Sequence, residues 1–314
     1  MKTQKTPASP PRKARNRAKT SNPVPAPWIE SPDLGTSAST APRRTPPIGV
    51  FDSGIGGLTV AAALRKLLPA EDIFYIGDTA RVPYGGKSAA TIERYSIEIS
   101  GLLLSEQAKL IVVACNTASA LAVPRLQEIL KVPVTGVILP GAKAAVEATR
   151  TGRIGVIGTR ATTYSRAYER AIYALAPDTV VLSQACPLLV PLIEEGWIAD
   201  PIADQVIARY LEALVREKID TLVLGCTHYP LLRGCIQKYV GDSITLVDSA
   251  HNCAVAVREL LQAQRLTAPA DHLGQLTVAL TDASDGFLRV AEDALGLQVG
   301  DVQLRTVQGV AAGI

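Results

Sequence analysis

Short apolar runs of strand length begin abruptly at Ile48 and alternate with stretches of helical periodicity along most of the chain. Runs that are apolar throughout are typical of strands buried on both faces, as in parallel sheets covered by helices on each side. The composition supports such a core, because 47% of the residues are hydrophobic and only 4% are aromatic. The pattern therefore predicts an α/β fold with mostly parallel sheets. The predicted strands span residues 48–51, 73–77, 110–114, 134–137, 153–157, 179–182, 221–224, 244–247, 276–280 and 302–306, and predicted helices include 89–107 and 203–217.

A weak internal repeat indicates two similar halves. The tripeptide Ile-Gly-Val at 48–50 recurs at 154–156, and the predicted strand before Cys115 is echoed by the one before Cys226, 111 residues later. Each half consists of a strand, a loop of small residues, a helix and a further strand that ends at a cysteine. We therefore expect two similar doubly wound α/β domains with the active site in the cleft between them.

The basic character of the chain is confined to its first residues. Residues 1–47 contain nine Lys and Arg, two acidic residues and ten of the 21 prolines; they carry a net charge of +7 in a chain whose total is +3, so the remaining residues carry −4. A segment of this composition cannot bury enough apolar surface to offset the entropy of ordering. We therefore expect residues 1–46 to form a disordered basic tail. As an accessory role, such a tail would contact nucleic acid or an acidic partner by charge alone.

The cellular setting follows from what the chain lacks. No apolar run reaches the roughly 18 residues of a membrane span, and the first 47 residues lack the apolar region of a secretory signal. The five cysteines include no CxxC pair and no zinc-like spacing. We expect a cytoplasmic protein with reduced thiols, no metal and no membrane partner.

Two of the cysteines are candidate functional residues. Cys115 and Cys226 each follow a predicted buried strand and precede a predicted helix, and polar residues come next. Ligands of open α/β sheets bind at the carboxyl ends of the strands. A helix N-terminus favours the thiolate, so we expect the pKa of each thiol to fall below about 8.5. A free cysteine is also a common core residue; that interpretation is preferred for Cys235 and Cys253, and Cys186 lacks the polar context too.

A glycine-rich turn, Asp-Ser-Gly-Ile-Gly-Gly at 52–57, follows the first predicted strand. It fits neither of the common phosphate-binding patterns, and an aspartate at its mouth would repel phosphate. We expect its backbone N–H groups and Ser53 to approach a small ligand, with Asp52 facing an ammonium group or a thiol. Capping of the following helix is an equally common role for Asp52 or Ser53.

A long polar loop, residues 77–88, follows the second predicted strand. Loops at this edge of a sheet often carry binding residues. The segment Pro83–Gly85 would present the backbone N–H groups of Tyr84 and Gly85, which suit a carboxylate, although the composition alone favours a plain turn.

His228 lies two residues after Cys226. A metal site needs three or more ligands and no third is evident, so a partner for the thiol in acid–base chemistry is the better interpretation. A structural histidine remains the alternative. Glu194 and Glu195 are adjacent, and the simplest interpretation of the two is a solvated pair.

Six segments, in order along the chain, resemble the glutamate racemases. Together they are highly specific, and the resemblance extends from about residue 48 to 306. The segments are 48–60 (IGVFDSGIGGLTV), 75–88 (YIGDTARVPYGGKS), 113–120 (VACNTASA), 155–163 (GVIGTRATT), 186–196 (CPLLVPLIEEG) and 224–232 (LGCTHYPLL).

The resemblance implies a cofactor-independent isomerase that interconverts L- and D-glutamate by proton transfer between two cysteines, supplying D-glutamate for peptidoglycan. It implies a first domain of residues 47–139 plus 249–306 and a second domain of 140–248. No cofactor is expected. A monomer or homodimer is expected, and some members respond to a peptidoglycan precursor as an activator.

The resemblance also implies roles for individual residues. Cys115 and Cys226 would be the two acid–base residues, assisted by Asp52 and His228 respectively, and Glu194 would be a helper. The groups expected at the α-amino and α-carboxylate of the substrate are Asp52, Ser53, Asn116, Thr117 and Thr227. Those expected at the side-chain carboxylate are Pro83, Tyr84, Gly85, Thr159 and Thr162.

The alternatives within the superfamily are an aspartate racemase, which also has a cysteine pair, and a one-cysteine decarboxylase or isomerase, against which the presence of both cysteines with His228 argues. The first turn of aspartate racemases usually lacks the Asp-Ser pair, and glutamate usually stands where His228 stands here, so the sequence favours glutamate. Two departures from the glutamate racemase pattern, Gly86 for threonine and Leu139 for an acid, do not touch the expected catalytic residues.

Overall fold

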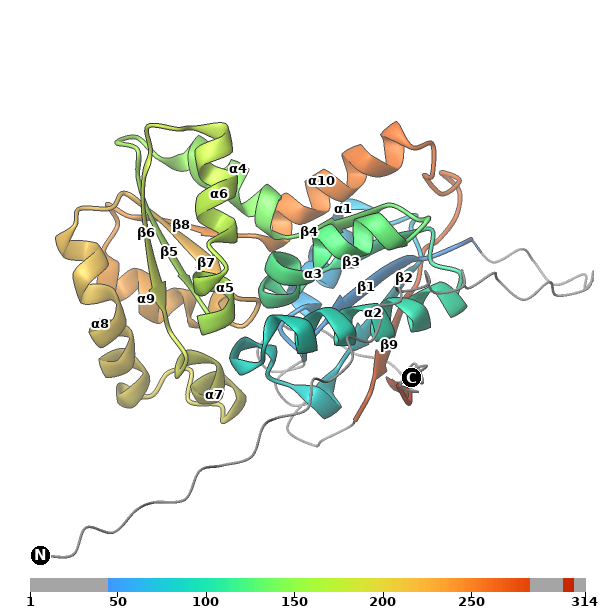
Figure 1. The fold of residues 1–314 in the computed structure, drawn as a ribbon, viewed down its shortest axis with the longest axis horizontal. Helices are drawn as coiled ribbons and strands as arrows, with labels where there is room; N and C mark the ends of the chain where they lie inside the picture. Colours follow the sequence, from blue (N-terminus) through green and yellow to red (C-terminus); the bar gives the residue numbers. More distant parts are fainter. Residues whose placement is uncertain (1–44, 283–301, 308–314) are drawn as a thin grey trace, which may run out of the picture. The chain divides into compact units, whose positions relative to one another are not determined.

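The computed structural model describes residues 45–282 and 302–307, which belong to one compact unit that begins at Arg44. Nearly all of the expected tail, residues 1–46, lies outside the described residues. Within them, ten strands form two sheets in which every neighbouring pair is parallel. The prediction of an α/β fold with two doubly wound parallel sheets is confirmed (Figure 1).

The larger sheet has six strands in the order β10-β9-β2-β1-β3-β4. We call this sheet and the helices that cover it the first lobe. Its strands are β1 (Ile48–Asp52), β2 (Ile73–Gly77), β3 (Leu110–Val113), β4 (Val134–Gly136), β9 (Leu276–Leu280) and β10 (Val302–Leu304).

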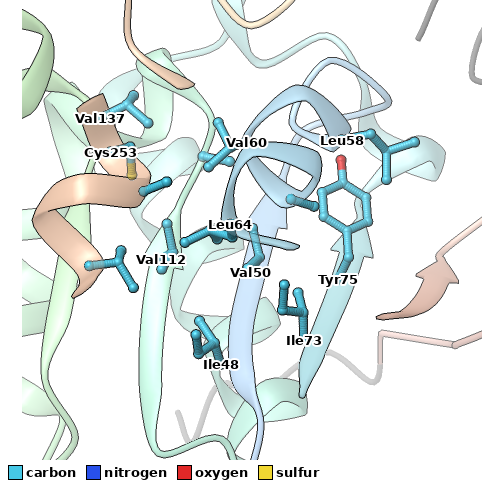
Figure 2. Close-up of a cluster of buried hydrophobic side chains, with 14 of the residues drawn as sticks. Ile48, Val50, Leu58, Val60, Leu64, Ile73, Tyr75, Val112, Val137 and Cys253 are labelled. Atoms are coloured by element: carbon cyan, nitrogen blue, oxygen red, sulfur yellow. The ribbon is translucent and has the colours of Figure 1, made fainter. Parts of the chain in front are cut away.

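Helices cover both faces of the first sheet because its strands are apolar on both sides. Ile48 and Val50 of β1 pack in one cluster with α1 (Leu58–Leu67) and α10 (Ala250–Ala263) (Figure 2). Phe51 points to the opposite face, into a second cluster. The helices of that second cluster are α2 (Ala89–Ser105) and α3 (Asn116–Ile129).

The smaller sheet has four strands in the order β6-β5-β7-β8, and with its helices it forms the second lobe. It too is covered on both faces, by α7, α8 and α9 on one side and by α4 and α6 on the other. The strands are β5 (Arg153–Gly158), β6 (Val180–Ala185), β7 (Thr221–Gly225) and β8 (Thr245–Asp248). The helices are α4 (Ile138–Ala148), α5 (Arg160–Tyr164), α6 (Ala167–Leu175), α7 (Leu189–Glu194), α8 (Pro201–Arg216) and α9 (Arg233–Val240).

Three short 3-10 helices lie in loops: η1 (Thr79–Arg81), η2 (Tyr84–Gly86) and η3 (Tyr229–Leu232). None of the helices within residues 45–282 and 302–307 is long and apolar enough to cross a membrane.

Within residues 45–282 and 302–307, the chain crosses between the lobes twice. It leaves the first sheet after β4 and enters the second lobe with α4, and after β8 it returns with α10, so that β9 pairs with β2. The internal repeat alone did not predict this return, whereas the resemblance did. The domain boundaries at 139 and 248 stay a prediction.

Candidate active site

Strand register places the two candidate cysteines beside other polar residues. In the first sheet Phe51 pairs with Val113, so the turn at Ser53 and the residue Cys115 leave the same edge. Cys115 Sγ lies 3.6 Å from Ser53 Oγ. In the second sheet β5 and β7 end together, with Gly158 opposite Gly225, so Thr159 and Cys226 emerge side by side.

Both cysteines line one pocket, to which both lobes contribute. Its volume is about 20 Å³, which is room for about one water molecule. The lining residues are Ser53, Val82, Pro83, Tyr84, Gly85, Cys115, Asn116, Thr117, Thr159, Val190, Cys226, Thr227 and His228. Sequence reasoning missed Val82 and Val190, whose apolar side chains carry no chemical signal. Two expected residues, Asp52 and Thr162, lie behind the pocket wall.

Asp52 is fully buried and holds the turns of both lobes in place. Its Oδ2 accepts a hydrogen bond from the N–H of Gly54 at 3.0 Å. Its Oδ1 accepts one from the Thr227 hydroxyl at 3.3 Å, beside Cys226. The carboxylate therefore caps its own turn and also joins the turn that carries the second cysteine.

Cys115 is the N-cap residue of α3 and is 5% exposed. Burial and the negative charge of Asp52 raise the pKa of the Cys115 thiol to about 12. The Ala118 N–H and the Ser53 hydroxyl favour the thiolate but do not offset these effects. The expectation that the helix N-terminus would lower the pKa is therefore wrong for Cys115, because desolvation outweighs the helix end.

His228 joins the Cys226 turn to Glu194. Nδ1 of His228 lies 3.9 Å from Cys226 Sγ, and Nε2 lies 3.3 Å from Oε1 of Glu194. Burial disfavours the charged imidazole, but the Cys226 sulfur and the Glu194 carboxylate outweigh it and raise the pKa of His228 to about 10. The imidazole therefore lies between a sulfur and a carboxylate, both of which favour its charged form. Glu194 and Glu195 are both exposed, as a solvated pair would be, and Glu194 in addition faces His228.

Cys226 differs from Cys115 in its backbone setting. The sequence predicts a helix after Cys226, and in the structure Thr227, His228 and η3 precede that helix, α9. The turn leaves His228 next to the sulfur. It places no regular helix N-terminus there.

Asn116 presents its amide to the pocket. Its Oδ1 accepts a 2.7 Å hydrogen bond from the hydroxyl of Tyr168 in α6. Its Nδ2 is buried and has no hydrogen-bond partner among the described residues. A buried donor without a partner is costly unless a ligand accepts from it.

Three threonine hydroxyls from the two lobes form a triangle at the pocket wall. Thr117 Oγ1 lies 2.9 Å from Thr159 Oγ1 and 3.2 Å from Thr162 Oγ1, and the last two are 3.0 Å apart. Gly85 packs against this cluster, and a Cβ added there would lie 2.6 Å from Thr159 Cβ. Glycine is therefore required for the pocket loop to approach the second lobe this closely.

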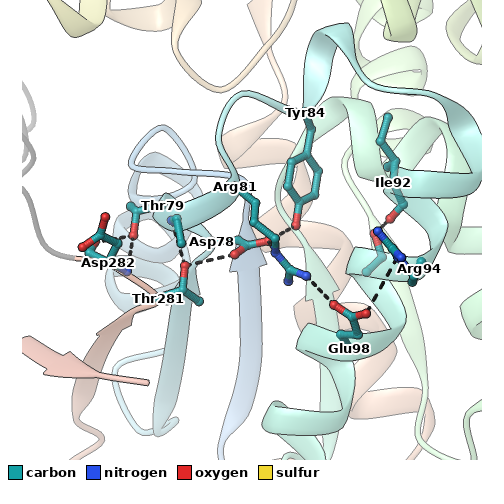
Figure 3. A network of polar contacts seen from close by, with 11 residues as sticks. Asp78, Thr79, Arg81, Tyr84, Ile92, Arg94, Glu98, Thr281 and Asp282 are labelled. Carbon is teal, nitrogen blue, oxygen red and sulfur yellow. Dashed lines mark hydrogen bonds and ion pairs between the residues drawn. The ribbon is translucent and has the colours of Figure 1, made fainter. Parts of the chain in front are cut away.

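A buried polar network holds the loop at Pro83–Gly85 in place (Figure 3). Asp78 accepts hydrogen bonds from the Tyr84 hydroxyl, from Arg81 Nε at 2.7 Å and from the Thr281 hydroxyl at 3.0 Å. Arg81 also forms an ion pair with Glu98 of α2. Because the hydroxyl of Tyr84 is hydrogen-bonded to Asp78, Tyr84 can bind a ligand in the pocket only through its backbone.

The other three cysteines have structural surroundings. Cys253 belongs to the first-lobe core, and Cys186 is buried with its carbonyl accepting from the Tyr229 hydroxyl at 2.9 Å. Cys235 of α9 donates to the carbonyl of Ile198 at 3.3 Å. No cluster of His, Cys, Asp or Glu suited to a metal ion occurs among residues 45–282 and 302–307.

The fold of two parallel sheets, with one free thiol from each lobe on a shared pocket, matches a known class of enzyme. Residues 56–258 match the family described as Asp/Glu/Hydantoin racemase, and the chain belongs to that family. Within it, the protein is similar to glutamate racemases. The glutamate racemase of Geobacter metallireducens is 50% identical over 255 residues, which cover 81% of this chain and 94% of that protein. The resemblance drawn from the six sequence segments is thereby confirmed.

Solved structures agree in fold. A glutamate racemase isoform from Bacillus anthracis superposes with a TM-score of 0.80 at 41% identity, covering 83% of this chain and 98% of that one. Escherichia coli glutamate racemase, solved in complex with L-glutamate and the activator UDP-MurNAc-ala, has a TM-score of 0.70 at 30% identity, covering 84% of this chain and 100% of that one.

Proposed function

We propose that this protein is a cofactor-independent racemase that interconverts L- and D-glutamate by proton transfer between Cys115 and Cys226. The observation that supports it best is that two thiols from equivalent strand ends of the two lobes line a single pocket. Two opposed acid–base groups are what racemisation requires, because one group cannot remove a proton from one face and return a proton to the other without moving.

The surroundings of the thiols suggest their resting protonation states. Cys115, beside the Asp52 carboxylate, is the thiol and carries the proton to be donated. His228 as imidazolium can donate a hydrogen bond to the Cys226 sulfur, and we assign Cys226 as the base in this direction. In one turnover the α-proton passes to the Cys226 sulfur, its electron pair stays on the α-carbon, and Cys115 protonates the opposite face. The pair ends with a Cys226 thiol and a Cys115 thiolate, which is the starting state for the other enantiomer.

The carbanionic transition state needs charge stabilisation, since no cofactor acts as an electron sink. Preorganised donors in a dry pocket supply it, and they act most strongly where water is excluded. Candidate donors are the free Nδ2 of Asn116 and the hydroxyl of Thr117, which follow Cys115, whereas the Thr227 hydroxyl already donates to Asp52. We propose that these groups bind the α-carboxylate of the substrate and that its α-amino group lies near Asp52 and Ser53.

The side-chain carboxylate is assigned to the far wall of the pocket. Tyr84, Gly85 and Thr159 line the pocket there, so the two backbone N–H groups and the Thr159 hydroxyl are its proposed partners, with Thr162 hydrogen-bonded to Thr159 from behind the wall. Glutamate fills far more than the 20 Å³ enclosed here, so the lobes must separate at their two crossings to admit it. Closure then excludes water from the reaction.

The cellular role is part of the proposal. D-glutamate would be supplied in the cytoplasm for peptidoglycan synthesis, by a monomer or homodimer. The E. coli relative was solved with a muramyl nucleotide activator, and that supports testing a peptidoglycan precursor as an activator of this protein. The basic tail stays a proposed accessory contact whose binding should weaken with salt.

The test is circular dichroism of L-glutamate with purified protein and no added cofactor, with L-aspartate run in parallel. The expected result is decay of the glutamate signal to zero while the aspartate signal persists. Decay of aspartate alone would overturn the substrate assignment in favour of an aspartate racemase. No decay of either, with and without a muramyl precursor, would overturn the activity.

A further inference from the structure

Tyr168 connects the second lobe to the Cys115 turn of the first. It lies in α6 and is 2% exposed, yet its hydroxyl donates a 2.7 Å hydrogen bond to Asn116 Oδ1. Asn116 directly follows Cys115 and lines the pocket. No sequence motif pointed to Tyr168, and it does not line the pocket itself.

Two glycines shape the slot that holds the tyrosine ring. A Cβ added to Gly225, the residue before Cys226, would lie 3.1 Å from Cε2 of Tyr168. A Cβ added to Gly141, in the first turn of α4, would lie 3.0 Å from the tyrosine hydroxyl oxygen. Tyr168 therefore touches the strand end that carries the second thiol and the helix where the chain enters the second lobe.

The hydrogen bond determines which end of the Asn116 amide faces the pocket. An amide has an acceptor end and a donor end that occupy nearly the same volume. With Oδ1 accepting from Tyr168, the donor Nδ2 is left buried and without a partner among the described residues. If the amide turned over, its carbonyl oxygen would face the substrate carboxylate and repel it.

We propose that Tyr168 is a positioning residue for racemisation, which keeps the Asn116 Nδ2 directed at the substrate carboxylate where negative charge develops. This inference rests on the proposed racemase function. Tyr168 acts through Asn116 and does not touch the reacting atoms. Because this hydrogen bond joins α6 of the second lobe to Asn116 of the first, the donor is aligned while the lobes are closed.

The first test is Tyr168→Phe, which removes the hydroxyl and keeps the ring in its slot. Removal of one oxyanion donor typically costs about 10²–10³ in kcat. Loss of its orientation should cost about 10-fold to 100-fold in kcat, with a smaller change in KM. In an Asn116→Ala background the same substitution should have no further effect, because the group through which it acts is absent. An equal loss in both backgrounds would overturn the inference in favour of a general structural role.

Gly141→Ala is a second test that keeps both hydrogen-bonding groups. The new methyl group would lie 3.0 Å from the Tyr168 hydroxyl, which must shift to accommodate it, so kcat should fall. Gly101→Ala in α2 is the matched control, since a Cβ there meets nothing within 4 Å. Equal kcat in the two alanine variants would count against the inference.

The wild-type protein in the same glutamate assay separates the two possible failures. If the wild type does not racemise glutamate, the proposed function fails and this inference falls with it. If the wild type turns over and Tyr168→Phe matches its kcat, only the role of Tyr168 is overturned.

Discussion

The turns at Cys115 and Cys226 occupy equivalent places in two similar sheets, yet their surroundings are chemically opposite. Cys115 begins a regular helix and has a buried carboxylate, Asp52, as its charged neighbour. Cys226 begins an irregular turn and has His228 beside it, with Glu194 behind the imidazole. One thiol therefore lies next to an anion and the other next to a group that becomes a cation.

The difference shows how a symmetric fold can support an asymmetric resting state. Repetition of the α/β unit places two thiols on one pocket, and the side chains around them decide which one holds the proton. A nearby anion favours the neutral thiol, and a nearby cation favours the thiolate. A pair that shares one proton is ready to remove a proton on one side and deliver one on the other.

Removing either thiol should have the largest effect. Cys115→Ala or Cys226→Ala leaves one face without an acid–base group, so racemisation should fall by about 10³-fold or more in both directions. Polarimetry from each enantiomer measures this. Cys235→Ala is the control, because that thiol contacts Ile198 and not the pocket, and it should keep wild-type turnover. Near wild-type activity of either pocket variant would refute the two-thiol mechanism.

Asp52→Asn tests the anionic side of the comparison. The Asp52 charge raises the pKa of Cys115, so its removal lowers that pKa. The donor thiol then ionises at a lower pH, and the alkaline limb of the pH–rate profile should shift toward neutral pH. At neutral pH we expect turnover to fall by about 10-fold, since a cap hydrogen bond and the link to Thr227 are also weakened. An alkaline limb that stays in place or moves upward would break the assignment of Cys115 as the resting thiol.

The strand-end turns could be anticipated from the sequence, and the reason is local. Continuous apolar runs mark buried strands, and the residues that follow them must meet at one edge of a parallel sheet, so Cys115, Cys226 and their neighbours were found from the pattern. Their electrostatics could not be found that way. The pKa of Cys115 depends on burial among groups from several elements. The helix N-terminus alone predicts a lowered pKa, whereas burial and Asp52 raise it.

Long-range contacts explain the remaining omissions. Thr281 donates to Asp78 across 203 positions, and Tyr168 to Asn116 across 52, so no short motif contains either pair. Val190 lines the pocket from α7 with an apolar side chain that resembles any core residue. Such residues can be identified only once the fold brings distant segments of the chain together.

Gly56→Ala should disturb the Cys226 turn from the opposite lobe. A Cβ at Gly56 would lie 2.4 Å from Thr227 Oγ1 and 2.8 Å from His228 Nδ1, so the turn must move and misalign the base. A displacement of this kind should lower kcat/KM by about 10-fold. Gly234→Ala, whose Cβ meets nothing within 4 Å, should behave as wild type. Equal activity of the two variants would mean that the two turns do not need this contact.

Glu194→Gln should have the smallest effect. Its carboxylate raises the pKa of His228 from a position that is partly open to solvent, where charge interactions are weak. The pKa of His228 should fall, and kcat should drop by about two- to five-fold near neutral pH. Titration of the imidazole by NMR measures the shift. An unchanged pKa of His228 would show that Glu194 does not stabilise the imidazolium.

The most direct test of the central claim is the isotope content of the product formed from L-glutamate in deuterium oxide during the first few per cent of turnover. Two opposed thiols remove the α-hydrogen to one sulfur and deliver a solvent-derived deuteron from the other. The account therefore predicts D-glutamate that is deuterated at the α-carbon while the remaining L-glutamate is still unlabelled. D-glutamate that retains the substrate hydrogen would show that a single group carries the proton between faces, and it would contradict the roles assigned to Cys115 and Cys226.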